Sequence, residues 1–312
     1  MYSSKFFHII TLASILITAW SDVSLARLYD RSPYKYYYYG RDEELVDELD
    51  HKLQQKVNYI ESHLQEKLNK SVNIYLTLTL DEFNNLTRGQ VPGWAGGIAV
   101  PRRNTVILKT PLFFGQGVPL EVLAAHELTH ILIHQIVGDN YLPRWFEEGL
   151  CQVLSGESRH GSLGRLGRAA AARRLMGLPR VDDVLSFSHG DADLAYAESR
   201  SAAAKLIDQF GWDAVVQLLR RVGKGEEFEN AFPVVMGVEY EYWQVEWIEY
   251  AHKKYSFAVL LDIDYLIWVF IVLLGTVALT AVFIRRRIQF RRWLKEEEEE
   301  GEEDDYSKPI TP

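Results

Sequence analysis

The sequence contains a single cysteine, Cys151, among its 312 residues. One thiol excludes an intramolecular disulfide and a cysteine-based metal site. A small buried thiol on a helix is the ordinary interpretation of such a residue. Because Cys151 lies three positions after Glu148, a place near a site built around that glutamate stays open.

The sequence also has no excess of positive charge, since the formal net charge is −9. Nine acidic residues lie between Glu296 and Asp305, so the rest of the chain is close to neutral. This distribution gives no support to a nucleic-acid partner. The chain also lacks an internal repeat, while its 47% hydrophobic residues suffice for a substantial core.

The first of two long apolar segments, residues 6–20, follows Lys5 and ends close to Ser24-Leu25-Ala26. A basic residue, an apolar stretch and small residues before a cleavage point are typical of a secretory signal peptide. We therefore expect residues 1–26 to be a signal peptide with a cleavage site after Ala26. If it is not cleaved, it would be a second membrane anchor, and the domain between the anchors would still lie outside.

The second segment, residues 265–284, has 20 residues without a charge. A helix of this length spans about 30 Å, the thickness of the hydrocarbon layer. Five arginines follow directly, which argues against a buried core helix and favours a cytoplasmic tail over 285–312, basic and then acidic. The part from Arg27 to about residue 257 would then lie on the outer face.

Between these segments the pattern predicts a single α+β domain over residues 42–257, after a Tyr-rich extended linker at 27–41. Its N-terminal part would be a helix and a small sheet, and its C-terminal part helical, with the active-site helix at its start. The expected strands are 72–80, 94–100 and 105–109, and the expected helices are 42–69, 120–137, 143–154, 165–176, 199–210 and 212–222.

The helix expected at 120–137 contains the motif His126-Glu127-Leu128-Thr129-His130. Histidines one helical turn apart share a face, so both imidazoles can reach one metal ion. Glu127 points about 100° away around the axis, which suits a carboxylate that acts on a water molecule instead of on the metal.

The third metal ligand must come from elsewhere in the chain. His134 is eight residues after His126, about 12 Å along the axis, too far for two bonds of about 2 Å to one ion. A histidine six residues after the second one is absent, since that position is Ile136. Glu148, on the helix that follows, is the expected ligand, with Glu147 as the alternative.

Over roughly residues 72–247 the sequence resembles the gluzincins, most closely the bacterial peptidase MA-like family. The resemblance rests on the motif at 126–130, on Leu-Pro-Arg-Trp-Phe-Glu-Glu-Gly-Leu at 142–150, and more weakly on Gly-Trp-Ala-Gly-Gly-Ile-Ala at 93–99 and Tyr-Ala-Glu-Ser at 196–199. One departure is Cys151, where such proteins often have alanine.

These features together predict a catalytic site with one Zn²⁺ per chain. His126, His130 and Glu148 would hold the metal, and Glu127 would be the general base. By analogy with related aminopeptidase-type enzymes, the resemblance implies that Tyr196 stabilises the oxyanion. An edge strand would bind an extended substrate through four residues, Trp94, Gly96, Gly97 and Ala99.

We therefore expect a zinc metallopeptidase of the bacterial inner membrane, a single-pass protein with a periplasmic catalytic domain. Its partners would be the lipid bilayer and a peptide or protein substrate of the cell envelope. The alternative is a non-catalytic, zinc-stabilised module for envelope assembly or signalling. The intact Glu127 argues against that alternative, because a structural zinc site needs no general base.

Overall fold

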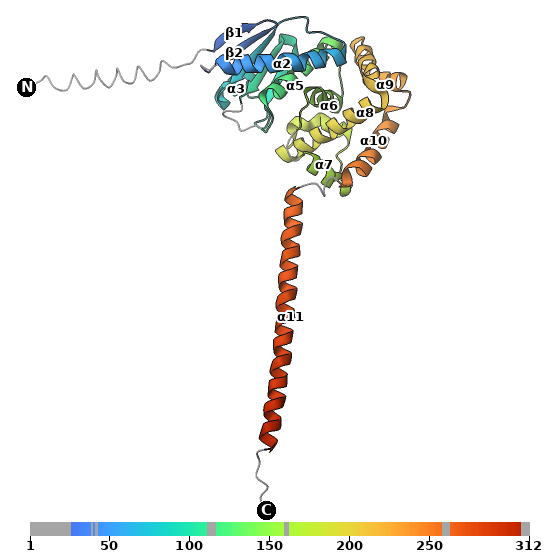
Figure 1. Cartoon of the computed structure of the whole chain (residues 1–312). Helices are drawn as coiled ribbons and strands as arrows, with labels where there is room; N and C mark the ends of the chain where they lie inside the picture. Colours follow the sequence, from blue (N-terminus) through green and yellow to red (C-terminus); the bar gives the residue numbers. More distant parts are fainter. Residues whose placement is uncertain are drawn as a thin grey trace, which may run out of the picture. The chain divides into compact units, whose positions relative to one another are not determined.

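The computed structural model describes residues 26–38, 40, 43–110, 117–158, 162–257 and 263–306. These residues belong to two compact units, which divide the chain between Ser256 and Phe257. Residues 1–25 of the expected signal peptide at 1–26 lie outside the described residues, and the signal peptide stays a prediction. Figure 1 shows the elements of the first unit, a small sheet followed by a series of helices.

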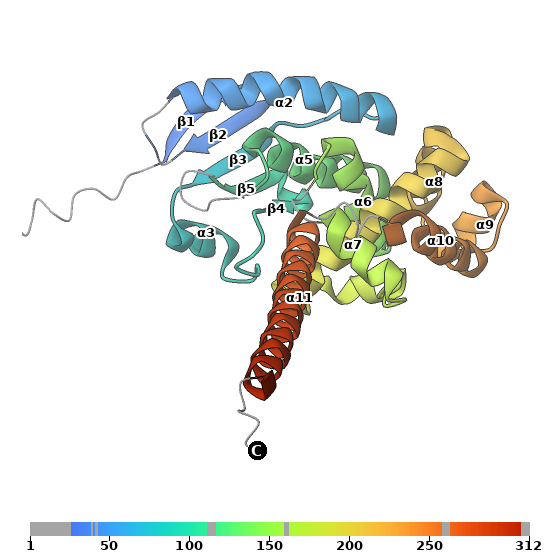
Figure 2. The ribbon, with the colours of Figure 1, turned by 60° about the horizontal axis from the view of Figure 1, so that its bottom comes forward.

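The N-terminal half of the first unit is a five-stranded sheet. Its strands are β1 (Arg27–Arg31), β2 (Tyr34–Tyr38), β3 (Val72–Thr77), β4 (Gly97–Val100) and β5 (Thr105–Lys109), in the order β1-β2-β3-β5-β4. The three central strands are parallel, whereas β1 and β4 run antiparallel to their neighbours at the two edges. Helix α2 (Glu43–Leu64) connects β2 to β3 and runs along the sheet (Figure 2).

The expected linker at 27–41 is wrong, because β1 and β2 occupy most of it. Tyr34, Tyr36 and Tyr38 are buried at alternate positions, and the hydroxyl of Tyr36 donates a hydrogen bond of 2.9 Å to Asp50 on α2. Aromatic residues at every second position are typical of a half-buried strand. The unbroken tyrosine run hid this alternation in the sequence.

The other predicted strands are confirmed in part, with shorter bounds. Thr79 accepts a hydrogen bond from the amide of Glu82 and caps α3 (Leu80–Thr87), so β3 ends at Thr77 instead of residue 80. A side-chain cap of this kind satisfies amides that the first helical turn leaves open. Trp94 and Gly96 lie in the segment that precedes β4 and not within a strand. A short 3-10 turn, η1 (Pro101–Arg103), joins β4 to β5.

The second half of this unit is helical, as expected. It comprises α5 (Leu120–Val137), α6 (Arg144–Ser155), α7 (Ser162–Ala171), η2 (Leu178–Ser186), α8 (His189–Gly223), α9 (Phe228–Met236) and α10 (Tyr240–Tyr255). The two helices expected at 199–222 belong to α8, which kinks at Gly211, where φ is +80°. Glycine adopts this backbone conformation without steric cost.

Helix α6 packs closely against α8 through Gly149. A Cβ atom at this position would overlap the backbone oxygen of Ser199 and lie 2.7 Å from the Cβ of Ala203. A glycine beside Glu148 therefore permits this close approach between the two helices. This contact fixes the position of α6 relative to the rest of the helical half.

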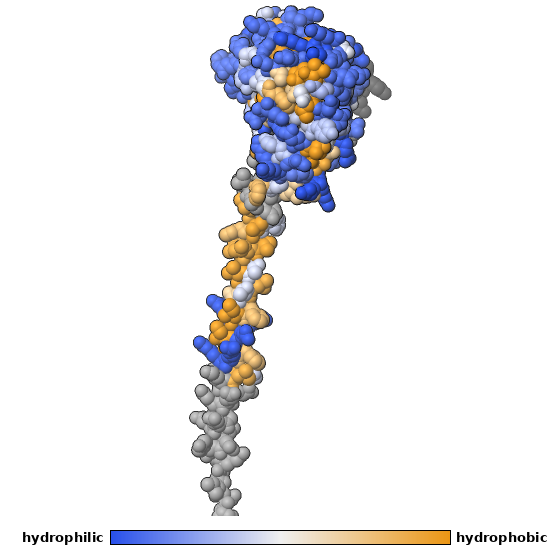
Figure 3. Space-filling view, turned by 90° about the vertical axis from the view of Figure 1, so that its right-hand side faces the viewer, coloured by the Kyte–Doolittle hydropathy of each residue, from blue (hydrophilic) through white to orange (hydrophobic). Residues whose placement is uncertain are grey.

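The second unit contains one long helix, α11 (Ile263–Tyr306). Its stretch Leu266–Leu294 is apolar and long enough to cross a membrane, with exposed side chains throughout. Figure 3 shows this stretch as a largely apolar surface. One C-terminal apolar helix is therefore present, and the predicted span 265–284 lies almost wholly within it. Together the two units form a mixed helical structure with a small sheet, in agreement with the α+β prediction.

Candidate metal centre and its pocket

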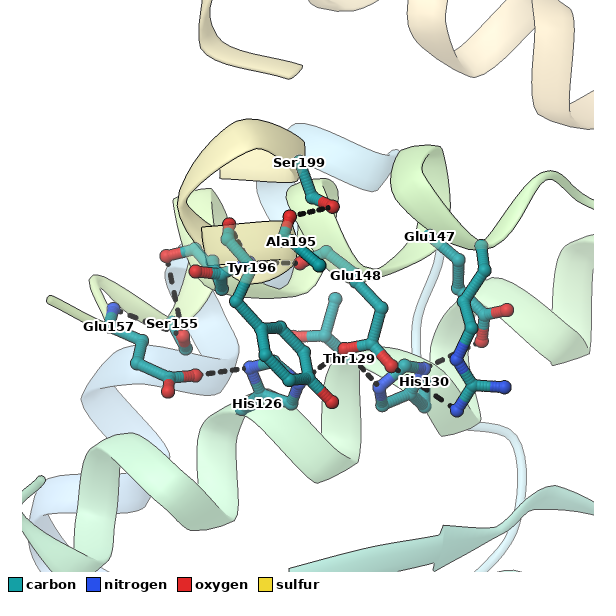
Figure 4. A network of polar contacts seen from close by, with 12 residues as sticks. His126, Thr129, His130, Glu147, Glu148, Ser155, Glu157, Ala195, Tyr196 and Ser199 are labelled. Carbon is teal, nitrogen blue, oxygen red and sulfur yellow. Dashed lines mark hydrogen bonds and ion pairs between the residues drawn. The ribbon is translucent and has the colours of Figure 1, made fainter. Parts of the chain in front are cut away.

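The helix α5 positions two histidines on one side of a pocket. Because α5 packs against α2, α6, α8 and the sheet, 13 of its 18 residues are buried, and the side chains of His126 and Glu127 are among them. The rings of His126 and His130 lie one turn apart with centroids 5.1 Å from each other. As predicted from their spacing, both imidazoles project toward the same space (Figure 4).

Glu148 approaches this space from α6. Its Oε2 atom lies 3.3 Å from Nε2 of His126 and 3.7 Å from Nε2 of His130. Two donor atoms about 2.0–2.1 Å from a tetrahedral ion are separated from each other by about 3.3 Å. The two separations between the Glu148 oxygen and the imidazole nitrogens therefore fit a metal ion such as zinc.

The two alternative ligands lie elsewhere. Oε1 of Glu147 is 2.6 Å from Nδ1 of His130, on the side of the ring that faces away from Glu148. Nε2 of His134 lies 3.2 Å from the same Glu147 oxygen, and its Nδ1 is 3.1 Å from the carbonyl of Gly138. Neither side chain joins the three donors, in agreement with the preference for Glu148.

The buried thiol of Cys151 lies near the two histidines, a place that the sequence left open. Its sulfur and one ring nitrogen from each of His126 and His130 lie within 4.8 Å of one another. Burial raises the pKa of this thiol well above its ordinary value, and nearby carboxylates such as Glu147 add to the effect. Glu148 lines the pocket together with both histidines, whereas Cys151 is not among the residues that line it, which favours Glu148 as the third donor.

The charges around the histidines perturb several pKa values. Burial lowers the pKa of His126, but the carboxylates of Glu157 and Glu148 outweigh it and hold this pKa well above its ordinary value. Burial likewise lowers the pKa of His130, and Glu147 outweighs it. Burial would raise the pKa values of Glu147 and Glu148, yet the histidines lower both. Such a concentration of carboxylates favours a cation between them.

Glu127 lies beside the strand β4. A Cβ atom at Gly97 would be 3.1 Å from Oε1 of Glu127, so only a glycine lets the strand come this close without a shift. Glu127 is 7% exposed, and burial raises the pKa of its carboxyl group. The side chain thus faces the pocket without belonging to the three donors.

All nine residues predicted from the sequence line this one pocket, whose cavity volume is about 260 Å³: Trp94, Gly96, Gly97, Ala99, His126, Glu127, His130, Glu148 and Tyr196. Tyr196 extends from α8, and its ring lies above His126 in Figure 4. Its ring also contacts Trp94 edge-on, with centroids 6.1 Å apart. The structure therefore brings the predicted residues together, while their roles remain predictions.

Two further residues of the pocket were not among the predicted site residues. Glu157 follows the C-terminal turn of α6, and its Oε2 atom lies 2.6 Å from Nδ1 of His126. Arg144 begins α6, and its Nη2 atom lies 3.5 Å from Oε1 of Glu148. Only the folded arrangement reveals Glu157, whereas Arg144 stands four residues before Glu148, the spacing of an ion pair along a helix.

A comparison with protein-family models matches residues 53–253 to the Peptidase MA superfamily. The matched stretch starts within α2, ends within α10 and includes every residue of the pocket. A search of curated proteins found no match.

Proposed function

Because the chain belongs to the Peptidase MA superfamily, we propose that it is a membrane-anchored, zinc-dependent peptidase with Glu127 as its general base. The convergence of His126 Nε2, His130 Nε2 and Glu148 Oε2 is the observation that carries this proposal. Three protein donors at an accessible pocket leave one position open, which is the arrangement of catalytic and not of structural zinc sites.

Zinc bound by these donors would supply Lewis-acid chemistry, which polarises the scissile carbonyl and makes a water molecule more acidic. Glu127 accepts the proton of the attacking water and passes it to the leaving amine. Its position one residue after His126, outside the three donors, supports this division of roles. The low exposure of the carboxyl group keeps bulk water away from the transferred proton.

Tyr196 is the proposed donor to the oxyanion of the tetrahedral intermediate. The hydroxyl group of a tyrosine can donate one hydrogen bond, and Tyr196 lines the same pocket as the three donors. The edge-on contact with Trp94, in the segment before β4, restricts the motion of the Tyr196 ring on that side. Held in this way, the hydroxyl would be positioned before the charge develops.

An extended substrate would pair with β4, the edge strand beside the pocket. The amide of Lys109 donates to the carbonyl of Gly96, and the pairing direction alternates along antiparallel strands. The backbone groups of Gly97 and Ala99 therefore point away from β5, toward an edge that no other described strand covers. Strand addition at such an edge binds peptide backbone of any sequence.

The location follows from the apolar stretch of α11 and the charges that flank it. The arginines after residue 284 favour a cytoplasmic C-terminus, which would put the peptidase unit on the periplasmic face of the inner membrane. Protease added to spheroplasts should then digest the peptidase unit and leave a fragment that contains residues 296–312. Digestion of this tail from outside would reverse the topology.

The decisive experiment compares Glu127→Gln with Glu148→Ala in the purified full-length chain. We expect the first variant to be folded, zinc-loaded and about 10²–10⁴-fold slower on a library of unstructured peptides. The second should lose zinc and stability together. Wild-type turnover by Glu127→Gln would contradict the enzymatic proposal. A zinc-loaded wild type without turnover, combined with full complementation by Glu127→Gln, would favour the non-catalytic envelope module.

A further inference from the structure

Each histidine of the proposed zinc site has a carboxylate on its second ring nitrogen. Oε2 of Glu157 lies 2.6 Å from Nδ1 of His126, and Oε1 of Glu147 lies 2.6 Å from Nδ1 of His130. From this geometry we propose that Glu157 and Glu147 are positioning residues, which orient the two imidazoles toward Glu148. This inference rests on the proposed function and extends it to residues outside the three donors.

The orientation of the His126 ring is the first part of the argument. With Nδ1 against Glu157, the opposite nitrogen of the ring points to Oε2 of Glu148. An imidazole that donates its Nδ1 proton to a carboxylate has its Nε2 lone pair free for a metal ion. The 2.6 Å contact with Glu157 thereby sets the direction in which His126 faces.

Glu157 is built into this position by the end of α6. Gly156 ends the helix with φ +74°, and the amide of Glu157 donates to the carbonyl of Gln152 and to the hydroxyl of Ser155. The carboxylate is 1% exposed, and an isolated buried charge is costly. Its contact with His126 offsets that cost and ties the fold of this turn to the metal site.

Glu147 does the same for His130 from the first turn of α6. Its Oε1 atom also contacts Nε2 of His134 at 3.2 Å, so one carboxylate joins two histidines of α5. His134 is half-buried and reaches the rim of the pocket. The role left for His134 is therefore to hold Glu147, which in turn holds His130.

The third donor has a charged partner as well. Nη2 of Arg144 lies 3.5 Å from Oε1 of Glu148, so the other oxygen of this carboxylate faces the histidines. Each proposed ligand thus has a charged partner on the side away from the proposed metal. All three partners lie on α6 or directly after it: Glu157, Glu147 and Arg144. A single helix positions one ligand and the partners of all three.

The test measures zinc affinity in the full-length chain in detergent, by competition with a chromogenic chelator. We expect Glu157→Leu, which removes the acceptor, to bind zinc about 10–100-fold more weakly than the wild type. Glu157→Gln keeps an oxygen acceptor without the charge, so its affinity should lie between the two. Glu198→Gln is the matched control, a buried glutamate of α8 outside the pocket, and it should bind zinc like the wild type.

Two readouts separate positioning from a merely structural role. The melting temperature of the zinc-free variants reports folding, and the visible spectrum of the cobalt-loaded protein reports ligand geometry. Loss of zinc affinity with partial rescue by glutamine and a changed cobalt spectrum would support the inference. If Glu157→Leu does not fold, the Gln variant decides alone, and it must bind zinc more weakly than the control.

Zinc affinities within twofold of the wild type in Glu157→Gln and Glu157→Leu would overturn the positioning role and leave the proposed function standing. A wild-type chain that binds no zinc would instead overturn both. The two failures are therefore distinguishable in one series of titrations.

Discussion

Replacing Gly149 by alanine tests whether the contact between α6 and α8 controls the metal site. The added Cβ would overlap the carbonyl oxygen of Ser199 and come within 2.7 Å of the Cβ of Ala203. Both neighbours belong to a packed helix, so the two helices must move apart. Inserting a methyl group into such a contact costs about 1–3 kcal/mol, and the severity of this overlap points to the upper value.

Alanine also has a higher helix propensity than glycine, by about 1 kcal/mol. The expected net loss for Gly149→Ala is therefore about 2 kcal/mol, which corresponds to a fall in melting temperature of about 4–8 °C for a unit of this size. Because Glu148 is the adjacent residue, displacement of α6 should weaken zinc binding as well. Calorimetry and chelator competition on the purified chain measure the two effects.

The control is Gly190→Ala in the first turn of α8, where an added Cβ meets only a flexible arginine end at 3.7 Å. Its stability should stay the same or rise by up to about 1 kcal/mol, with zinc affinity unchanged. If Gly149→Ala melts within 1 °C of the control, about the error of such a comparison, the close contact does not limit the packing. If it melts lower but binds zinc normally, α6 is not what positions Glu148.

Three further predictions follow from single positions. Gly97→Ala should slow peptide cleavage while zinc content stays full, because its Cβ would lie 3.1 Å from the Glu127 carboxylate and none of its three nearest atoms is a proposed metal donor. A normal rate would show that β4 tolerates the shift. Cys151→Ala should retain one zinc per chain in metal analysis, and loss of zinc would instead identify the thiol as a ligand. Burial raises the pKa of Glu198 to about 7, against about 4.3 in an unfolded chain. The stability that this carboxyl contributes is complete below about pH 4.3 and disappears as the pH rises through about 7. Denaturant titrations of wild type and Glu198→Gln should therefore show a stability difference that changes between pH 5 and 8, and parallel curves would contradict the shift.

The local patterns of the sequence predicted much of the fold. The spacing of apolar residues predicted α2 and α5, and the length of the apolar stretch after residue 264 predicted a helix able to span a membrane. These features are visible because helical periodicity and span length depend on neighbours along the chain. The strands β1 and β2 were missed, since consecutive tyrosines hide which of them face the core.

The same distinction holds for the pocket. The spacing of His126 and His130 alone determines that both lie on one face of a helix, and their separation from His134 argues against it as a ligand. The choice between Glu147 and Glu148 needed the structure. Adjacent residues on a helix point about 100° apart, and only the packing of α6 decides that Glu148 lies near the Nε2 atoms of His126 and His130.

The contribution of Glu157 belongs wholly to the tertiary structure, whereas Arg144 pairs with Glu148 along one helix. Glu157 lies 31 positions from His126 in the chain, and its contact depends on where α6 ends and how the next residues turn. No periodicity relates two such positions, because their distance is set by the packing of α5 against α6. The sequence therefore determined which residues could form a metal site, while tertiary packing decided which further side chains contact them.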